Sequence, residues 1–369
     1  MKKLGFGLMR LPLSESGDSK DIDREAAKEM IDAYMAAGFN YFDTAYVYHR
    51  GSSEKMFGEL VADRYERSSY VLTDKMPVWL IKEPADYDKI FEKQLARTHA
   101  GYFDYYFLHA LGNQSMEDVE KFDGFGYLQK KKAEGLIRHA GFSFHGDAAT
   151  LEKLLIAHPE TELVQLQINY VDWESQSVES RKCYELCVKY GKTVSVMEPV
   201  KGGSLARVPE KVEELFRAEE PEKSPASWAL RFAGSLENVL VVLSGMSSME
   251  QLQENMEIFD HFSPLTEKEQ DVIRKATEIF NGMAVIPCTA CHYCTDGCPM
   301  NIAIPEYFSN YNTMKLYGYE PSMQNMYDST SKLRGKASEC VACGQCEEHC
   351  PQHLSIIENL KAVAEVFER

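Results

Sequence analysis

Short β-rich runs alternate with amphipathic helical segments over about the first 260 residues of the chain. Together with the apolar LGFGL near the start, they give eight strand candidates and eight helix candidates. Such alternation predicts parallel strands joined by crossover helices. Eight units predict an α/β fold of the (β/α)8 TIM-barrel type, and a doubly wound open sheet is the alternative. The expected strands after the first are residues 40–45, 70–75, 103–109, 137–144, 163–169, 193–198 and 238–245. The expected helices are residues 23–38, 54–65, 86–99, 125–135, 147–158, 177–191, 224–234 and 247–260.

The composition changes after the eighth unit. Residues 266–283 have the apolar periodicity of an amphipathic connecting helix, and the chain becomes rich in cysteine from about Ala284. A domain boundary at this point predicts a barrel of residues 1–283 and a smaller, mostly helical domain of residues 284–369.

The charge balance argues against some classes of partner. Lysine and arginine number 40 against 57 acidic residues, a net charge of −17, which disfavours binding to nucleic acid or anionic membranes. No apolar run approaches the length of about 18 residues that a membrane-spanning helix needs. We therefore expect a cytoplasmic protein with neither a membrane nor a nucleic acid as partner.

Eight of the ten cysteines lie between Cys288 and Cys350, in two runs of equal spacing. In a reducing cytosol such density indicates metal binding rather than disulfides. Each run reads Cys-x2-Cys-x2-Cys-x3-Cys-Pro, the ligand spacing of two-cluster bacterial ferredoxins. Structural zinc is the alternative, but zinc takes four cysteines in two pairs rather than two runs of four. The predicted ligands of two 4Fe–4S clusters are Cys288, Cys291, Cys294, Cys298, Cys340, Cys343, Cys346 and Cys350.

The fourth cysteine of each run is expected to bind the neighbouring cluster. One cluster would then be held by Cys288, Cys291, Cys294 and Cys350, and the other by Cys340, Cys343, Cys346 and Cys298. The region resembles dicluster ferredoxin domains, although residues 299–339 separate the two runs. That insertion contains the helix-like IPEYFSNYNTMKLYG, which is typical of the helical variety of ferredoxin.

Four ionisable residues fall at the C-terminal ends of adjacent expected strands, where (β/α)8 barrels place their chemistry. Asp43 and Tyr48 follow the second strand, Lys75 ends the third and His109 ends the fourth. A buried Lys75 needs a carboxylate, which Asp43 could supply. A cationic Lys75 beside Tyr48 would favour the phenolate and make the phenol a usable proton donor to a developing alkoxide. His109 could orient the carbonyl oxygen.

These segments resemble the tetrad motifs of the aldo-keto reductases. The resemblance rests on DTAYVYHRGSSEKMFGE at 43–59, LTDK at 72–75 and FLHA at 107–110, and it extends over about residues 4–260. It implies nicotinamide-dependent interconversion of a small carbonyl compound and an alcohol. By this resemblance Tyr48 is the general acid, Asp43 and Lys75 tune it, and His109 positions the substrate.

The resemblance also implies where NAD(H) or NADP(H) would bind at the barrel mouth. Ser143 and Gln167 match the residues that hold the nicotinamide carboxamide, although Phe144 replaces the family's usual asparagine. Met197 falls where the family often stacks an aromatic ring, and methionine can pack there less rigidly.

The adenosine end is implied by the segment GMSSMEQLQEN at 245–255. Glu254 and Asn255 match the adenine contacts. Gly245 and Gln251 replace the basic residues that hold a 2′-phosphate in NADPH-preferring members. Met9 and Arg10, at the end of the first strand, are also expected to touch the cofactor.

Three functions follow from these features. The intact tetrad favours a nicotinamide-dependent carbonyl or alcohol oxidoreductase, coupled to or accompanied by electron transfer through the clusters. An electron-transfer protein with an external redox partner is the second, because simple hydride transfer does not need clusters. A redox-sensing or regulatory barrel is the third.

Overall fold

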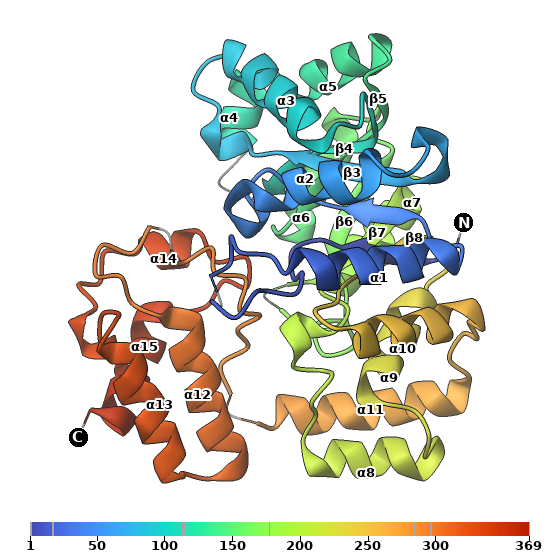
Figure 1. Cartoon of the computed structure of the whole chain (residues 1–369). Helices are drawn as coiled ribbons and strands as arrows, with labels where there is room; N and C mark the ends of the chain where they lie inside the picture. Colours follow the sequence, from blue (N-terminus) through green and yellow to red (C-terminus); the bar gives the residue numbers. More distant parts are fainter. Residues whose placement is uncertain are drawn as a thin grey trace. The chain divides into compact units, whose positions relative to one another are not determined.

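The computed structural model describes residues 2–16, 18–112, 116–176, 178–283, 285–295 and 297–368. Eight parallel strands pair in chain order and close into a barrel, with β8 beside β1 (Figure 1). The predicted (β/α)8 fold is confirmed and the open sheet is wrong. The strands are β1 (Leu4–Gly7), β2 (Tyr41–Asp43), β3 (Val71–Met76), β4 (Phe103–Leu111), β5 (Ile137–Phe144), β6 (Leu163–Gln167), β7 (Thr193–Met197) and β8 (Val239–Gly245).

Helices follow the strands and continue beyond the barrel. Those of the barrel region are α1 (Arg24–Ala36), α2 (Ser52–Phe57), α3 (Ala85–Thr98), α4 (Met116–Lys121), α5 (Gly124–Ala133), α6 (Ala148–Ala157), α7 (Ser180–Lys189), α8 (Glu210–Glu219), α9 (Pro225–Gly234) and α10 (Met249–Asp260). Those that follow are α11 (Glu267–Asn281), α12 (Ile304–Tyr317), α13 (Pro321–Ser331), α14 (Gln345–Glu348) and α15 (Ile356–Phe367). Across the described residues, no helix combines the length and apolar character that crossing a membrane requires.

Two helices before residue 260 have no counterpart among the expected ones. These are α4 and α8, which add a second helix to two of the βα units. Helix α8 buries Val212 and Phe216 on one face, so its pattern is amphipathic like that of the other helices. The sequence analysis missed α8 because it assigned one helix to each strand.

The barrel and the cysteine-rich region lie in different compact units. One unit comprises Met1–Pro199 and Ser227–Thr266, and the other comprises Val200–Ala226 and Glu267–Arg369. The second unit thus includes α8, which packs with α11; Lys268 Nζ lies 2.7 Å from a carboxylate oxygen of Glu219. The boundary between residues 283 and 284 stays a prediction.

Helices α12, α13 and α15, orange to red in Figure 1, enclose the core of the second unit. The ring centroids of Tyr307 and Tyr327 are 4.6 Å apart, and Tyr327 stacks on Phe367 at 5.2 Å. All three rings are buried. The cysteine runs pack against this same core, so the helices form the scaffold on which the cysteines are held.

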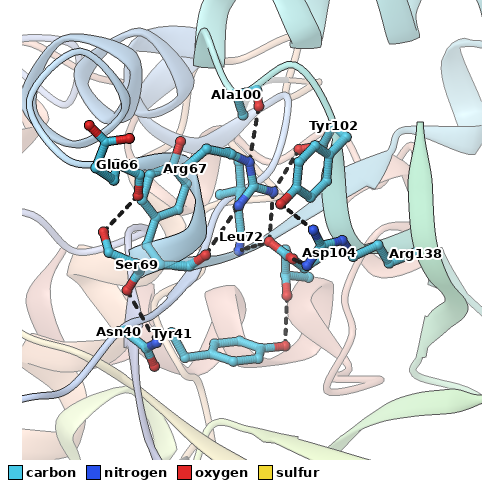
Figure 2. A network of polar contacts seen from close by, with 12 residues as sticks. Asn40, Tyr41, Glu66, Arg67, Ser69, Leu72, Ala100, Tyr102, Asp104 and Arg138 are labelled. Carbon is cyan, nitrogen blue, oxygen red and sulfur yellow. Dashed lines mark hydrogen bonds and ion pairs between the residues drawn. The ribbon is translucent and has the colours of Figure 1, made fainter. Parts of the chain in front are cut away.

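Figure 2 shows a polar network that joins the starts of neighbouring barrel strands. Arg67 Nη2 donates to Asp104 Oδ2 at 2.7 Å, and the same oxygen accepts the N–H of Leu72 at 2.9 Å. Arg138 Nη1 donates to the other oxygen at 3.1 Å. A buried carboxylate without partners is costly, so these contacts stabilise the N-terminal end of the barrel. In barrels of this type the chemistry lies at the opposite end.

Candidate active site and cysteine cavities

The strand ends bring the predicted tetrad together at the C-terminal face of the barrel. Asp43 is the last residue of β2, Lys75 is the next to last of β3, and His109 lies near the end of β4. Tyr48 begins a short 3-10 turn after β2. Because the strands are parallel and paired in order, these four residues come from three neighbouring strand ends.

Lys75 lies at the centre of this group. Its Nζ donates to Asp43 Oδ1 at 2.6 Å, to the Thr44 carbonyl oxygen at 2.8 Å and to the Tyr48 hydroxyl at 3.3 Å. The same Nζ is 4.8 Å from the centroid of the Tyr48 ring. Lys75 has no exposed surface, so its positive charge depends on these neighbours rather than on water.

The carboxylate of Asp43 is the counter-ion of this lysine. Burial raises the pKa of Asp43, and the Lys75 ammonium opposes that shift. Gln165 Nε2 also donates to Asp43 Oδ2 at 3.3 Å. An ammonium held by a buried carboxylate stabilises a developing phenolate beside it.

His109 faces the same point with an uncharged ring. Burial, and then the charge of Lys75, lower the pKa of His109 well below its usual range. Its ring centroid is 6.0 Å from that of Tyr48, with the planes at 82°. Nδ1 is buried and has no hydrogen-bond partner among the described residues. A neutral imidazole donates one N–H, which suits the orientation of an oxygen.

The turn that carries Tyr48 is anchored by its neighbour, His49. The three residues after Tyr48 all have positive φ, with values of 49°, 51° and 87°. His49 Nδ1 donates to the Ser19 carbonyl oxygen at 2.6 Å, and its Nε2 accepts the N–H of Leu11 at 3.2 Å. These bonds hold the turn after β2 against the segment after β1. Sequence reasoning did not single out His49, because its partners are recognisable only in the folded chain.

This anchor predicts a measurable pH dependence of stability. Burial lowers the pKa of His49, so the unfolded chain binds a proton below about pH 6.5 that the folded chain resists. The free energy of unfolding should therefore fall with decreasing pH, by at most about 1.4 kcal/mol per pH unit for this group. His49→Gln retains a donor and an acceptor but does not titrate. Between pH 7.5 and pH 5, we expect the free energy of unfolding measured with urea to fall less in the variant than in the wild type.

His109 is present in both proteins, so its contribution to the pH dependence of the free energy of unfolding cancels in this comparison. Equal pH dependence of the wild type and His49→Gln would contradict a neutral, hydrogen-bonded His49.

A second buried group behind Lys75 also went unrecognised in the sequence. Asp74 Oδ1 accepts the N–H of Lys75 at 2.8 Å and Nε2 of Gln94 at 2.9 Å. Burial and then the charge of Glu54 raise the pKa of Asp74 well above its usual range. Arg97 Nη1 donates to Glu54 Oε2 at 2.6 Å. The one signal in the sequence that could have indicated this pair is that Glu54 and Asp74 are acidic residues within otherwise largely apolar segments.

The predicted carboxamide contacts lie on β5 and β6. Ser143 Oγ accepts the N–H of Ala110 at 2.8 Å and still has its own O–H to donate. Gln167 Nε2 donates to Asp172 Oδ2 at 2.8 Å. Both side chains are buried at the strand ends. A hydroxyl and an amide on neighbouring strands fit a planar carboxamide in chemistry.

The remaining cofactor candidates gather around β1, β8 and the start of α10. A Cβ on Gly245 would lie 3.0 Å from Arg10, so the Arg10 side chain covers this glycine. Ser247 Oγ donates to the Arg10 carbonyl oxygen at 2.7 Å, and Gln251 Oε1 accepts the N–H of Ser247 at 2.8 Å. The structure thus joins Arg10, Gly245 and Gln251 in one loop region.

The other side chains predicted to contact the cofactor differ in how far they are buried. Asn255 is buried and its Nδ2 donates to Ser244 Oγ at 3.0 Å. Glu254, Met9 and Met197 are each half-buried, and Met197 ends β7. The role of each in cofactor binding stays a prediction.

The cysteines line two separate cavities, and each cavity draws on both runs. Among the residues around the first cavity are Cys288, Cys291, Cys294 and Cys350. Among those around the second are Cys298, Cys340, Cys343 and Cys346. This is the exchange of the fourth cysteine between runs that the spacing predicts.

The chemistry of these cavities fits iron–sulfur clusters. Four thiol sulfurs and otherwise mainly apolar walls are what a [4Fe–4S] cluster takes from a protein. Burial raises the pKa of Cys346 to about 11, so such a thiol must lose its proton as it binds iron. Within the described parts of the chain, no three His, Cys, Asp or Glu side chains converge as a single ion requires.

Fold and site together define a parallel-barrel protein with an ionisable cluster at its C-terminal face, followed by a cysteine-rich helical region. Residues 3–278 match the aldo/keto reductase family, and residues 287–354 match the 4Fe-4S dicluster domain. The chain therefore belongs to the aldo/keto reductase family, whose members are oxidoreductases, and carries a ferredoxin-type dicluster domain.

Individual relatives agree with this placement. The uncharacterized oxidoreductase YqkF of Bacillus subtilis is 25% identical over 313 residues, covering 75% of this chain and 97% of that protein. An aldo-keto reductase from Bacillus halodurans in its holo form has a TM-score of 0.59 at 24% identity, covering 74% and 91% of the two chains. A Klebsiella pneumoniae aldo/keto reductase in complex with NADP and acetate has a TM-score of 0.56 at 20% identity, covering 74% and 90%. At these identities the two solved structures support the fold.

Proposed function

We propose that the barrel interconverts a small carbonyl compound and an alcohol, with Tyr48 as the general acid and base. The observation that carries this proposal is that the Asp43 carboxylate and the Tyr48 hydroxyl both contact the buried ammonium of Lys75. A phenol beside a cation is the arrangement that proton donation to an alkoxide requires.

In the reductive direction, Tyr48 gives its proton to the carbonyl oxygen as that oxygen gains negative charge. Lys75, held by Asp43, stabilises the phenolate that remains. Because the ammonium is buried, its interaction with the phenolate is stronger than it would be in water. In the oxidative direction the phenolate takes the proton back from the alcohol.

His109 would orient the carbonyl oxygen toward Tyr48. Its neutral ring can donate a hydrogen bond to this oxygen without competing with the tyrosine for the transferred proton. The Trp79 ring packs on it, with centroids 5.1 Å apart, and is 38% exposed. An exposed indole here favours a carbonyl compound with an apolar or aromatic group next to the reacting carbon.

A nicotinamide at the barrel mouth would supply or accept the hydride. Ser143 and Gln167 are the residues that would hold its carboxamide, by donating and accepting hydrogen bonds. Arg10 and Gly245, whose side chain and backbone adjoin, are the residues that we expect to lie beside the rest of the cofactor. The aldo/keto reductase fold and the NADP named with the Klebsiella pneumoniae structure support this assignment.

The proposal is tested by following NADH or NADPH oxidation by anaerobically purified full-length protein. A panel of aldehydes, from small aliphatic to aromatic, serves as substrate. We expect turnover with both cofactors and higher kcat/KM for aromatic aldehydes. Absence of turnover with every aldehyde, while NADH and NADPH still bind, would favour the electron-transfer or regulatory alternative.

The cofactor loop predicts little preference for a 2′-phosphate. Neither Gly245 nor Gln251 carries a charge, and a hydrogen bond to a charged group contributes about 1.5–3 kcal/mol. We expect fluorescence titration to give a Kd for NADH within about threefold of that for NADPH. Arg10→Met serves as the control, because Arg10 is the cation that covers Gly245. A strong preference for NADPH that disappears in Arg10→Met would show that Arg10 replaces the missing charges.

We also propose that the two cysteine cavities hold redox-active [4Fe–4S] clusters that exchange electrons with an external protein. Each cavity provides four thiols, and residues 287–354, which carry all eight, match the 4Fe-4S dicluster domain. Anaerobic reduction should produce an EPR signal that is lost when an electron acceptor is added. A signal that persists with every acceptor would indicate that the clusters are structural.

A further inference from the structure

The two cysteine cavities differ in how far their cysteines reach the surface. In the first cavity, Cys294 and Cys350 are buried, and the other two cysteines are half-buried. In the second cavity, Cys346 is buried but Cys343 is exposed. A redox centre exchanges electrons with another protein through the side on which it reaches the surface, so the second cavity is the better point of exchange.

The surface around the second cavity is apolar. Val341 lines this cavity and is 58% exposed, and Pro299, which also lines it, is exposed. Apart from the cysteines, its wall consists of aliphatic residues, methionine and proline, and no charged residue belongs to it. An apolar centre with a charged margin is the usual anatomy of a protein interface.

A basic segment, residues 332–336, supplies a charged margin. Lys332, Arg334 and Lys336 fall within these five positions of a chain whose net charge is −17. Leu333 between them is 84% exposed. Both lysines are exposed as well. A local cluster of positive charge on a strongly acidic protein selects for an acidic surface on a partner.

Contacts place this basic segment directly on the wall of the second cavity. Arg334 Nε donates to the Asn301 carbonyl oxygen at 2.9 Å, and the N–H of Gly335 donates to the same oxygen at 3.1 Å. Gly335 also forms a parallel bridge with Ile302. Ile302 and Met300 line the second cavity. Arg334 and Gly335 therefore lie against the wall of the second cavity, and the two lysines flank them in the chain.

Several acidic residues lie around this segment. Glu368 accepts hydrogen bonds from the N–H and the hydroxyl of Ser338 and interacts with the charge of Lys336, so it offsets part of the positive charge of the segment. Glu339 Oε2 accepts the backbone N–H of Lys336 at 2.9 Å, and Glu347 Oε1 accepts that of Ile357 at 2.8 Å. Both carboxylates are thus turned toward backbone donors. Glu348 is exposed on α14 and would face an acidic partner unfavourably, so the attraction must come from residues 332–336.

We propose that Lys332, Leu333 and Lys336, together with exposed Val341, form a docking surface for an acidic one-electron carrier protein. The carrier exchanges one electron at a time with the cluster that the second cavity would hold. When the reduced carrier gives up one electron it is oxidised by one, and the cluster is reduced by one. No covalent bond forms or breaks, and no further co-reactant is needed. This inference rests on the electron-transfer role proposed above for the two clusters, and it does not depend on the chemistry proposed for the barrel.

The test uses full-length, cluster-loaded protein and a plant-type [2Fe–2S] ferredoxin of net negative charge as the probe. Binding is measured by anaerobic calorimetry, and cluster reduction by stopped-flow absorbance. Lys332→Glu/Lys336→Glu should weaken binding by about tenfold or more at low salt, since two attractive charges become repulsive. Raising the ionic strength should reduce the difference. Leu333→Ser should weaken binding at both salt concentrations.

Lys275→Glu/Lys315→Glu is the matched control. It changes the net charge of the chain equally, but its exposed lysines lie on α11 and far along α12. We expect it to bind like wild type, with iron content and the reduced EPR signal unchanged in every variant. Equal weakening by both double variants, or no binding by wild type, would overturn the proposal. So would sedimentation showing that residues 332–336 instead join two copies of this chain.

Discussion

Tyr48→Phe is expected to lower kcat for carbonyl reduction by about 10²–10⁴-fold, because a positioned general acid contributes that much. The hydroxyl it removes is the one that Lys75 Nζ contacts at 3.3 Å. The ring and its packing remain, so the Kd for the nicotinamide cofactor should change little. Steady-state kinetics with the best aldehyde, together with fluorescence titration of the cofactor, measure both quantities.

Tyr46→Phe is the matched control. Its hydroxyl belongs to the same loop but accepts a hydrogen bond from Lys93 Nζ at 2.8 Å rather than from Lys75. We expect kcat within about twofold of wild type, since no proton donor is lost. Unchanged kcat in Tyr48→Phe, or equal losses in the two variants, would refute the role of Tyr48.

Paired cysteine variants are expected to reveal which thiols share a cluster. In the structure, Cys291 and Cys350 line the first cavity although they belong to different runs. Cys291→Ala/Cys350→Ala should therefore lose one cluster and keep about four of about eight iron atoms. Cys291→Ala/Cys298→Ala removes two cysteines from one run but one from each cavity. This second variant should lose almost all of its iron.

Iron analysis and EPR of anaerobically purified protein distinguish the two arrangements. If each cluster used the four cysteines of a single run, the results for the two variants would be reversed. Both variants lack the same number of thiols, so general destabilisation of the second unit would affect them alike.

The features that could be predicted from the sequence are those that repeat or follow a fixed spacing. The eight βα units have their own periodicity, and each parallel strand delivers its last residues to the same face. Asp43, Lys75 and His109 could thus be grouped from strand ends before any contact was known. The cysteine spacing likewise predicts that Cys298 and Cys350 exchange cavities.

Contacts between distant segments could not be predicted in this way. His49 carries no motif of its own. It anchors the Tyr48 turn through backbone groups of Ser19, 30 residues away in the sequence, and of Leu11, 38 residues away. Glu54 on α2 and Asp74 on β3 are 20 residues apart in the sequence, and periodicity does not show that their carboxylates interact. The packing of Trp79 on His109 depends on the path of the loop after β3.

The shared cavities link the cysteine-rich region to the iron supply of the cell. Each cavity is lined by cysteines of both runs, so in the proposed arrangement the first cluster would not close until the second run has been synthesised. Each inserted cluster then ties together segments about 50 residues apart, and metal binding of this kind contributes directly to folding free energy. Under the proposed arrangement, iron starvation would remove these ties between the two runs, while the buried rings of α12, α13 and α15 would still hold the helical core of the unit.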